Sequence, residues 1–382
     1  MGRSYNIVSI PGDGIGPEVN GAAVKVLKAA AEKYGFEARI TEYKAGGCAI
    51  DAFGVPLPGE TLEAANASDA VLLGAVGGPR WDMIEPEKRP EKALLGLRQG
   101  MHLYANLRPA IIHKELSNAS PLKNPGNIDL LIVRELTGGI YFGKQGSYES
   151  AEKLFDGTQK GKVTYDTESY SEAEITRILR RGFEFARIRN KKLTVVDKAN
   201  VLITSRMWRQ LAKEMAEEYK DIELDFLYVD NASMQLVARP SSFDVIVTSN
   251  MFGDILSDLA GQITGSVGML PSASLGNPGM PGMFEPIHGS APDIAGRHKA
   301  NPIASILSAE MMLRLHLGEK DAADAISEAV SKTLSQGART PDIALYGGED
   351  ASENTTIVTT EEMTDRIVAN RESETIWQGR SE

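Results

Sequence analysis

Alternating runs of apolar and polar residues predict an α/β protein from the first positions of the chain. A β-rich run at 6–10 leads into a turn rich in Gly and Pro, and residues 18–34 then carry apolar side chains at helical spacing. A second strand is predicted at 37–43, a helix at 61–67 and a short buried strand at 70–73. This strand–helix–strand rhythm indicates a largely parallel sheet that is flanked by helices.

The rest of the chain continues this alternation. Further strands are predicted at 128–133, 193–196, 224–229 and 245–248. Helices are predicted at 172–188, 206–219, 232–238, 252–260, 301–317 and 320–334. The tail from Thr356 is predicted to hold one short helix and then to fray.

Two segments break the pattern. Residues 144–169 are polar and Gly-spaced with little periodicity, which predicts a loop or an arm that packs on something else. Residues 265–296 are so rich in Gly, Pro and Ser that they predict a functional loop system without long elements.

Length, charge and cysteine content narrow the class of protein. A chain of 382 residues is long enough for two or three domains, and its net charge of −11 argues against general nucleic-acid binding. The single cysteine, Cys48, excludes an intrachain disulfide and is consistent with a reducing compartment. No apolar run approaches the roughly 20 residues of a membrane span, and the N-terminal run is too short for a signal peptide. We therefore expect a cytoplasmic protein.

The turn at 11–16, PGDGIG, is the first candidate for ligand binding. Glycines between a strand and a helix let the backbone approach a ligand closely. The spacing is G-x-G-x-G and differs from the dinucleotide fingerprint G-x-G-x-x-G. Taken alone, the motif favours a tight strand-to-helix turn without a ligand.

Paired carboxylates form the second candidate. Asp254 and Asp258 are spaced to lie on one face of a predicted helix, where their like charges repel and call for a compensating cation. Carboxylate oxygens are the ligands that hard divalent cations prefer. Asp230, at the end of a predicted strand, offers a third carboxylate. The alternative is an ordinary solvated helix face, although the apolar flanking residues favour a buried helix.

Three arginines form the third candidate. Arg98 follows Leu94 by one helical turn, Arg108 precedes a proline, and Arg134 ends a buried apolar strand. Guanidinium groups bind carboxylates bidentately, so three of them suit a small dicarboxylate. Three separate surface ion pairs remain an alternative.

Lys198 and Tyr141 could serve as an acid or a base if their pKa values were perturbed, although each residue taken singly favours a structural role. The five histidines include no pair at metal-ligand spacing. In the segment 285–296, small residues leave room for a flat or phosphorylated ligand. Asp293 is placed there to accept hydrogen bonds from ribose hydroxyls and to repel a 2′-phosphate.

Seven segments together identify a family resemblance. GDGIGPEV, NLRP, VRELTGGIYFG, VDKANV, FGDILSD, LPSASLG and EPIHGSAPDIAG occur in this order. The chain resembles the isocitrate and isopropylmalate dehydrogenases, a family of β-decarboxylating dehydrogenases. The resemblance implies a two-domain α/β fold of the isopropylmalate-dehydrogenase type, with a mostly parallel sheet and flanking helices, that is not a Rossmann fold. It also implies a discontinuous cofactor domain at 1–104 and 264–382, and a substrate and dimerisation domain at 105–263.

The resemblance also assigns roles by motif. Tyr141 and Lys198 are implied to be catalytic, and Asp230, Asp254 and Asp258 to bind Mg²⁺ or Mn²⁺. The implied substrate contacts are Glu91, Leu94, Leu95, Arg98, Arg108, Arg134, Asn200, Val201 and Asp230. The implied NAD contacts are Ile15, His288, Gly289, Ser290, Ala291, Asp293, Ile294 and Asn301. The resemblance further implies a homodimer with shared active sites. In it the segment 144–169 is the arm by which the two subunits clasp, and the partner subunit supplies Lys198 and Asp230 to each site.

The implied reaction is an oxidative decarboxylation. Lys198 acts as the base, directly or through a relay, NAD⁺ accepts the hydride, and Tyr141 helps to protonate the enolate carbon. Leu94 and Leu95 offer apolar surface for an isopropyl group, which favours 3-isopropylmalate as the substrate and 4-methyl-2-oxopentanoate and CO₂ as products, a step of leucine biosynthesis. The alternatives are tartrate-, malate- or homoisocitrate-type relatives and, more remotely, a non-catalytic regulatory subunit.

Overall fold

The computed structural model describes residues 2–150, 161–344 and 355–372, and the chain divides into two compact units. The first unit comprises Met1–Asp129 and Asp258–Glu382, and the second comprises Leu130–Ser257. The sequence places these boundaries near 104 and 263 instead. The strand β4 (Ala105–Ile111) pairs with β11 (Pro271–Leu275), and this pairing explains why it belongs to the first unit. The cofactor and substrate roles of the two units stay predictions.

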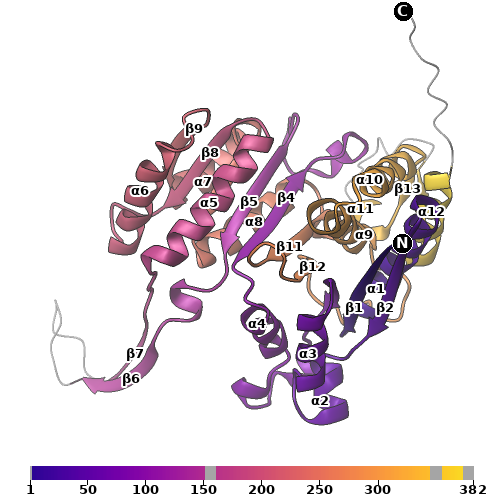
Figure 1. Ribbon diagram of the computed structural model, residues 1–382, viewed down its shortest axis with the longest axis horizontal. Helices are drawn as coiled ribbons and strands as arrows, with labels where there is room; N and C mark the ends of the chain where they lie inside the picture. Colours follow the sequence, from indigo (N-terminus) through magenta and orange to yellow (C-terminus); the bar gives the residue numbers. More distant parts are fainter. Residues whose placement is uncertain (1, 151–160, 345–354, 373–382) are drawn as a thin grey trace, which may run out of the picture. The chain divides into compact units, whose positions relative to one another are not determined.

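Six strands of the first unit follow the order β2-β1-β3-β12-β11-β4 (Figure 1). The other strands are β1 (Arg3–Gly12), β2 (Phe36–Glu42), β3 (Ala70–Ala75) and β12 (Gly282–Pro286). β1 is parallel to both β2 and β3, and β3 is parallel to β12, whereas β11 is antiparallel to its neighbours β12 and β4. The predicted parallel sheet is thus confirmed for the N-terminal strands, with an antiparallel insertion.

The prediction of a loop system at 265–296 was wrong in one respect. Two buried strands, β11 and β12, lie inside this segment and occupy the middle of the strand order. Each has only five residues and is bounded by Gly, Pro or Asn. β11 is built largely from small Ser and Ala residues, so it carries neither the alternation nor the β-branched composition that indicates a strand.

Helices pack around this sheet, and α1 (Gly16–Tyr34) contacts α9, α10 and α12. The apolar positions of α1 that set its predicted helical spacing are buried, which confirms that prediction. The other helices are α2 (Gly47–Phe53), α3 (Gly59–Ala67), α4 (Glu91–Gly100), α9 (Ile303–Met311), α10 (Lys320–Ser335), α11 (Pro341–Ala344) and α12 (Thr360–Glu372). The helix predicted at 301–317 changes to π-helical geometry after α9, at Met312–Leu317. The predicted tail helix is α12, and residues 373–382 lie outside the described part of the chain.

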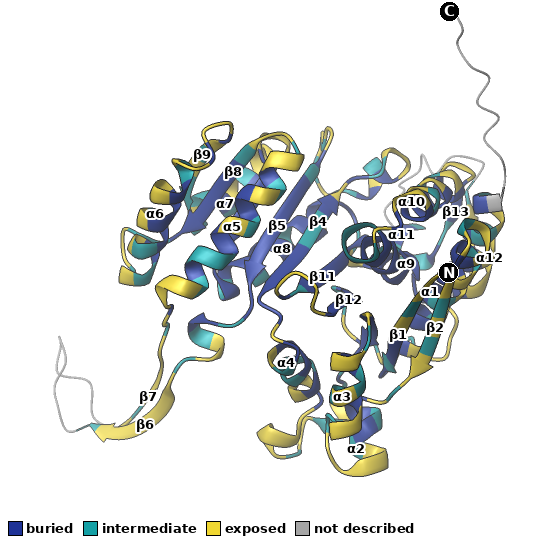
Figure 2. Ribbon diagram, viewed as in Figure 1, coloured by how far each residue is buried: buried dark blue, intermediate teal, exposed yellow. Residues whose placement is uncertain are grey.

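The second unit has four parallel strands in the order β5-β10-β8-β9. They are β5 (Asp129–Glu135), β8 (Lys192–Asp197), β9 (Glu223–Tyr228) and β10 (Val245–Thr248). The helices are α5 (Glu172–Ile188), α6 (Ile203–Ala216), α7 (Val229–Ala238) and α8 (Asn250–Ile263), whose last turns belong to the first unit. β5, β8 and β10 are almost entirely buried (Figure 2), whereas β9, at the end of the strand order, is exposed or half-buried along its length. All these elements were predicted within a few residues.

The predicted arm is a two-stranded antiparallel ribbon. β6 (Gln145–Ser150) pairs with β7 (Gly161–Asp166), and residues 151–160 lie outside the described part. Most of the ribbon is exposed (Figure 2), so it buries little surface within the unit. Among the described residues, no helix has the length and apolar character needed to cross a membrane.

Candidate active site

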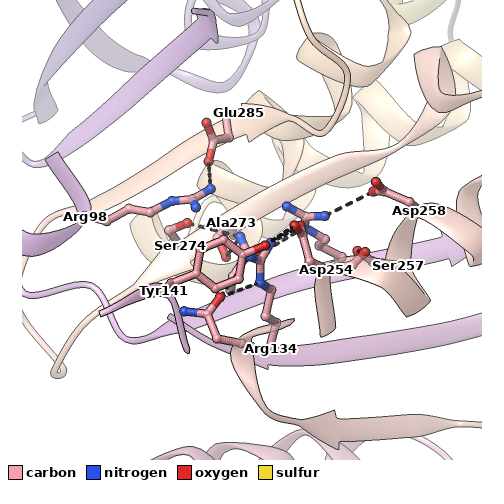
Figure 3. Close-up of polar contacts among 12 residues, drawn as sticks. Arg98, Arg134, Tyr141, Asp254, Ser257, Asp258, Ala273, Ser274 and Glu285 are labelled. Atoms are coloured by element: carbon pink, nitrogen blue, oxygen red, sulfur yellow. Dashed lines mark hydrogen bonds and ion pairs between the residues drawn. The ribbon is translucent and has the colours of Figure 1, made fainter. Parts of the chain in front are cut away.

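Three of the predicted site residues meet at the end of β5 (Figure 3). Arg134 is buried and forms an ion pair with the carboxylate of Asp254 on α8. The phenol of Tyr141 donates a hydrogen bond to Oδ2 of Asp254 at 2.8 Å, and the Arg134 guanidinium lies 5.5 Å from the centre of the Tyr141 ring. A cation, a carboxylate and a phenolic proton donor are therefore assembled within one unit.

The turn that carries Tyr141 is tightly constrained. The buried carboxylate of Glu135 accepts hydrogen bonds from the backbone N–H groups of Thr137 and Gly138, at 2.9 and 2.8 Å. Burial raises the pKa of Glu135, and these hydrogen bonds oppose that rise. Gly139 has a φ of 76°, and a Cβ there would lie 2.4 Å from Oη of Tyr170. Only glycine fits this position, so the turn places Tyr141 in a defined orientation.

A glycine on α8 brings Arg134 against that helix. A Cβ at Gly253 would lie 2.6 Å from Cγ of Arg134, closer than any side-chain contact permits. The Gly next to Asp254 in the motif FGDILSD therefore has a steric function. The neighbouring carboxylate is brought within reach of the arginine because the helix can approach so closely.

Lys198 and Asp230 form a second pair in the same unit. Lys198 directly follows β8 and Asp230 lies in the first turn of α7, after the neighbouring strand β9. The ammonium Nζ lies 2.5 Å from Oδ1 of Asp230, and this hydrogen bond lowers the pKa of the carboxyl group. The predicted base is thus associated with a carboxylate. Asn200 and Val201, which follow Lys198, are exposed.

The other two predicted arginines lie in the first unit. On β4, Nε of Arg108 donates to Oδ1 of the buried Asn106 at 2.7 Å, and Nη1 lies 3.4 Å from Oδ1 of Asp258. On α4, Nη2 of Arg98 donates to the carboxylate of Glu285 at 2.8 Å, with both side chains nearly buried (Figure 3). On the same helix Glu91 is exposed, whereas Leu94 and Leu95 are half-buried and Leu94 packs against the core.

Sequence reasoning missed the partners of these arginines. Asn106 and Glu285 each begin a motif that carried the resemblance, and Asn250 stands two residues before another. Their position beside the arginines depends on strands and helices that are distant in sequence, so spacing alone gave no signal. The one local clue in the sequence is that Asn106 interrupts an otherwise apolar run at 103–107, and the structure buries its side chain.

The donor set on α8 fits a hard divalent cation. Asp254 and Asp258 lie one helical turn apart and supply carboxylate oxygens, which Mg²⁺ and Mn²⁺ prefer. Each carboxylate also has an arginine partner, so α8 is not simply a solvated acidic face. Among the described residues of one chain, no three His, Cys, Asp or Glu side chains are grouped to hold a metal ion. The contribution of Asp230 from a second subunit stays a prediction.

The predicted cofactor residues come together in the first unit. The N–H of Ile15 donates to the carbonyl of Ser290 at 2.8 Å, so the turn at 11–16 lies against the segment 289–291. Ile15 is buried in a small apolar cluster, and Ala291 and Ile294 pack against it. Asp293 is exposed and Gly289 has open space around its α-carbon. An apolar platform beside exposed backbone and a carboxylate fits a nucleotide cofactor.

Two further cofactor candidates have clear structural partners. Burial lowers the pKa of His288, which favours the neutral imidazole, and its Nδ1 lies 2.9 Å from the Gly289 carbonyl. Its Nε2 is buried without a hydrogen-bond partner among the described residues. Oδ1 of Asn301 accepts a hydrogen bond from the N–H of Ile303 at the start of α9. The Asn301 side chain therefore satisfies the N–H of the first residue of the helix whether or not a cofactor binds.

Comparison with known proteins gives a consistent result. The family model described as isocitrate/isopropylmalate dehydrogenase matches residues 6–367. A 3-isopropylmalate dehydrogenase of Clostridium acetobutylicum is 57% identical over 351 residues, covering 91% of this chain and 96% of that protein. One from Pseudomonas fluorescens is 54% identical, covering 96% of this chain and 98% of that protein. The crystal structure of an isocitrate dehydrogenase from Methylococcus capsulatus is 35% identical with a TM-score of 0.82, covering 97% of this chain and all (100%) of that one. On these matches and on the site geometry, the chain belongs to the isocitrate/isopropylmalate dehydrogenase family, a family of oxidoreductases.

Proposed function

We propose that this protein catalyses the oxidative decarboxylation of 3-isopropylmalate to 4-methyl-2-oxopentanoate and CO₂. The observation that carries the proposal is the meeting of Arg134, Tyr141 and Asp254, which provides carboxylate binding, a proton donor and a metal ligand in one place. The choice of substrate is supported by the names of the relatives and by the half-buried leucines Leu94 and Leu95 on α4.

Two bound groups are part of the proposal. NAD⁺, bound on the apolar surface of Ile15 and Ile294, would be the hydride acceptor. Mg²⁺ or Mn²⁺, bound by Asp254 and Asp258, would act as a Lewis acid. The proposal of NAD⁺ over NADP⁺ is supported by Asp293, whose exposed carboxylate would repel a 2′-phosphate.

The side chains of this protein have separate tasks in the proposed reaction. The guanidinium groups of Arg98, Arg108 and Arg134 bind and orient the two substrate carboxylates. Lys198 of the Lys198–Asp230 pair, in its neutral amine form, takes the proton from the substrate hydroxyl as the ketone forms. Tyr141 then gives its phenolic proton to the carbon from which CO₂ has left.

The proposed working form is a homodimer in which a second copy of the chain contributes its Lys198–Asp230 pair. Exposed apolar side chains on α7 and α8 support one contact surface for the second copy of the chain. They are Met234, Val237 and Ile255. The exposed tyrosines of the ribbon, Tyr148 and Tyr165, support a second one. Symmetric pairing of identical chains would cover both surfaces in a single assembly.

A substrate panel tests the proposed function. NADH formation is followed with 3-isopropylmalate, isocitrate, malate and tartrate, each with NAD⁺ and NADP⁺ in the presence of Mg²⁺ or Mn²⁺. The proposal predicts the highest kcat/KM for 3-isopropylmalate with NAD⁺. A higher kcat/KM for any other acid would refute the choice of substrate.

A further inference from the structure

Asn250, the first residue of α8, contacts two neighbouring parts of the candidate active site from which it is distant in sequence. Its side chain is almost completely buried, at 2% exposure. Oδ1 accepts hydrogen bonds from Nε and Nη2 of Arg134, at 3.1 and 2.8 Å, while Nδ2 donates to the carbonyl of Gly138 at 3.2 Å. One amide therefore contacts both the arginine and the turn that carries Tyr141.

The nitrogen atoms of the Arg134 guanidinium bind two different partners. Arg134 presents the edge formed by Nε and Nη2 to Asn250, and it presents Nη1 to the carboxylate of Asp254. Because the guanidinium is planar, holding one edge fixes the direction of the other donors. The backbone of Asn250 is itself anchored, since its N–H donates to Oη of the buried Tyr170 at 2.9 Å.

We propose that Asn250 is a positioning residue for the reaction. It holds the Arg134 guanidinium and the Gly138 carbonyl in a fixed relation, so that the substrate-binding cation and the Tyr141 phenol converge on the same carboxylate. This inference rests on the proposed function, because it concerns the residues that would bind and protonate the substrate.

The chemistry of an amide suits this position better than that of a carboxylate. An amide oxygen orients a guanidinium without neutralising its charge, so the arginine keeps its attraction for a substrate carboxylate. An aspartate would form a buried ion pair with Arg134 and weaken that attraction. It would also place a second acceptor against the Gly138 carbonyl and lose the hydrogen bond that holds the turn.

If Asn250 served only folding, replacing it would lower stability without a specific effect on KM for the acid. Asn20, another buried asparagine, provides a matched control for this alternative. Asn20 on α1 is also 2% exposed, accepts a hydrogen bond from Oγ of Ser9 at 2.6 Å and donates one to the Leu72 carbonyl at 3.2 Å. It resembles Asn250 in burial and in using both ends of its amide, but among the described residues no arginine forms a hydrogen bond with it. Asn20→Asp therefore reports the cost of placing a carboxylate at a buried amide site.

The test compares three variants, Asn250→Asp, Asn250→Ala and Asn20→Asp. For each, kcat, KM for the acid, KM for NAD⁺ and the thermal unfolding temperature Tm are measured. The substrate is the acid that the wild-type enzyme oxidises fastest in the panel, so a wrong substrate assignment and a wrong role for Asn250 give different results. We expect Asn250→Asp, which preserves the volume, to raise KM for the acid about tenfold or more and to lower kcat. KM for NAD⁺ should change less than about twofold, and Asn20→Asp should lower Tm without changing KM for the acid.

Asn250→Asp with kcat and KM for the acid within about twofold of wild type would overturn the proposal. If that variant fails to fold, Asn250→Ala in an Arg134→Lys background decides the matter. A residue that acts through Arg134 should have a much smaller effect once Arg134 is replaced, so the two effects should not add. Full additivity of the two substitutions in kcat/KM would overturn the proposal as well.

Discussion

Oη of Tyr141 lies 2.8 Å from Oδ2 of Asp254 and donates a hydrogen bond to it. The same carboxylate is ion-paired with Arg134, so the phenol is held beside a cation as well as an anion. This geometry places the proposed proton donor next to the proposed metal ligand. The tyrosine can therefore be tested separately from the lysine, which is paired with Asp230 instead.

Tyr141→Phe removes the phenolic proton but keeps the ring beside Arg134. We expect it to slow release of the keto acid more than the first turnover of NADH, because the proton is needed after CO₂ has left. General acid catalysis of this kind typically contributes about 10²–10⁴-fold. Single-turnover NADH absorbance alongside quenched product analysis measures both steps. A slowed hydride step with normal decarboxylation would reverse the assigned role.

Lys198→Met is expected to suppress NADH formation itself, because the hydroxyl proton must leave as the ketone forms. The variant also breaks the pair with Asp230, whose pKa should then rise towards its ordinary value as the lowering contact is lost. Pre-steady-state NADH absorbance measures the effect. Normal NADH formation in this variant, with only later steps impaired, would exclude the lysine as the base.

Mixed dimers test whether sites are shared between subunits. Subunits carrying Lys198→Met are exchanged with subunits carrying Arg134→Gln, each nearly inactive alone. A shared site predicts one intact site in each mixed dimer and a return to about a quarter of wild-type activity after random exchange. If each site were built from a single chain, every site would keep one defect and activity would not return.

Leu95→Ala should reduce transition-state binding of 3-isopropylmalate by about 1–3 kcal/mol, because it removes apolar surface from the proposed isopropyl contact. It should also increase the relative preference for malate. Leu94 is a less clean test, since it packs against the core and its truncation should destabilise the fold too. Unchanged substrate ranking after Leu95→Ala, measured as kcat/KM, would argue that this helix face only packs against the protein.

Asp293 is expected to determine the choice between NAD⁺ and NADP⁺. Asp293→Asn removes the negative charge that would oppose a 2′-phosphate and should raise kcat/KM for NADP⁺ relative to NAD⁺. Equal kcat/KM for the two cofactors in the wild-type enzyme would contradict this role. Lys299, which is exposed and close in sequence, would then be the residue to replace, since its ammonium group could attract the phosphate.

Local patterns were sufficient to predict the long helices and most of the parallel strands of the fold. α5 has a strongly periodic apolar face and a Ser171–Glu174 capping box, so its predicted bounds at 172–188 agree with the structure. β10 was likewise predicted at its observed bounds because Val245, Ile246 and Val247 form a continuous apolar run that Thr248 ends, and all four residues are buried. β4 was not predicted as a strand, since Arg108 and Pro109 interrupt its apolar pattern.

The site could be predicted only as far as its motifs extend. Arg134, Tyr141 and Asp254 were identified individually, but their convergence depends on β5 and α8 lying together. The pairing of Arg98 with Glu285 joins α4 to β12 across a long stretch of sequence, and the amide of Asn250 lies between Arg134 and Gly138. Each of these contacts is made by single side chains that are distant in sequence. Such contacts produce no repeating pattern of residues from which they could be predicted.

The most direct test of the proposed oxidative decarboxylation is the stoichiometry of products from 3-isopropylmalate and NAD⁺. NADH, CO₂ and 4-methyl-2-oxopentanoate are quantified in the same reaction, with and without a chelator of divalent metals. We expect the three products in equal amounts and loss of all three on chelation, restored by Mg²⁺ or Mn²⁺. NADH formation without CO₂, or full activity in the chelator, would contradict it.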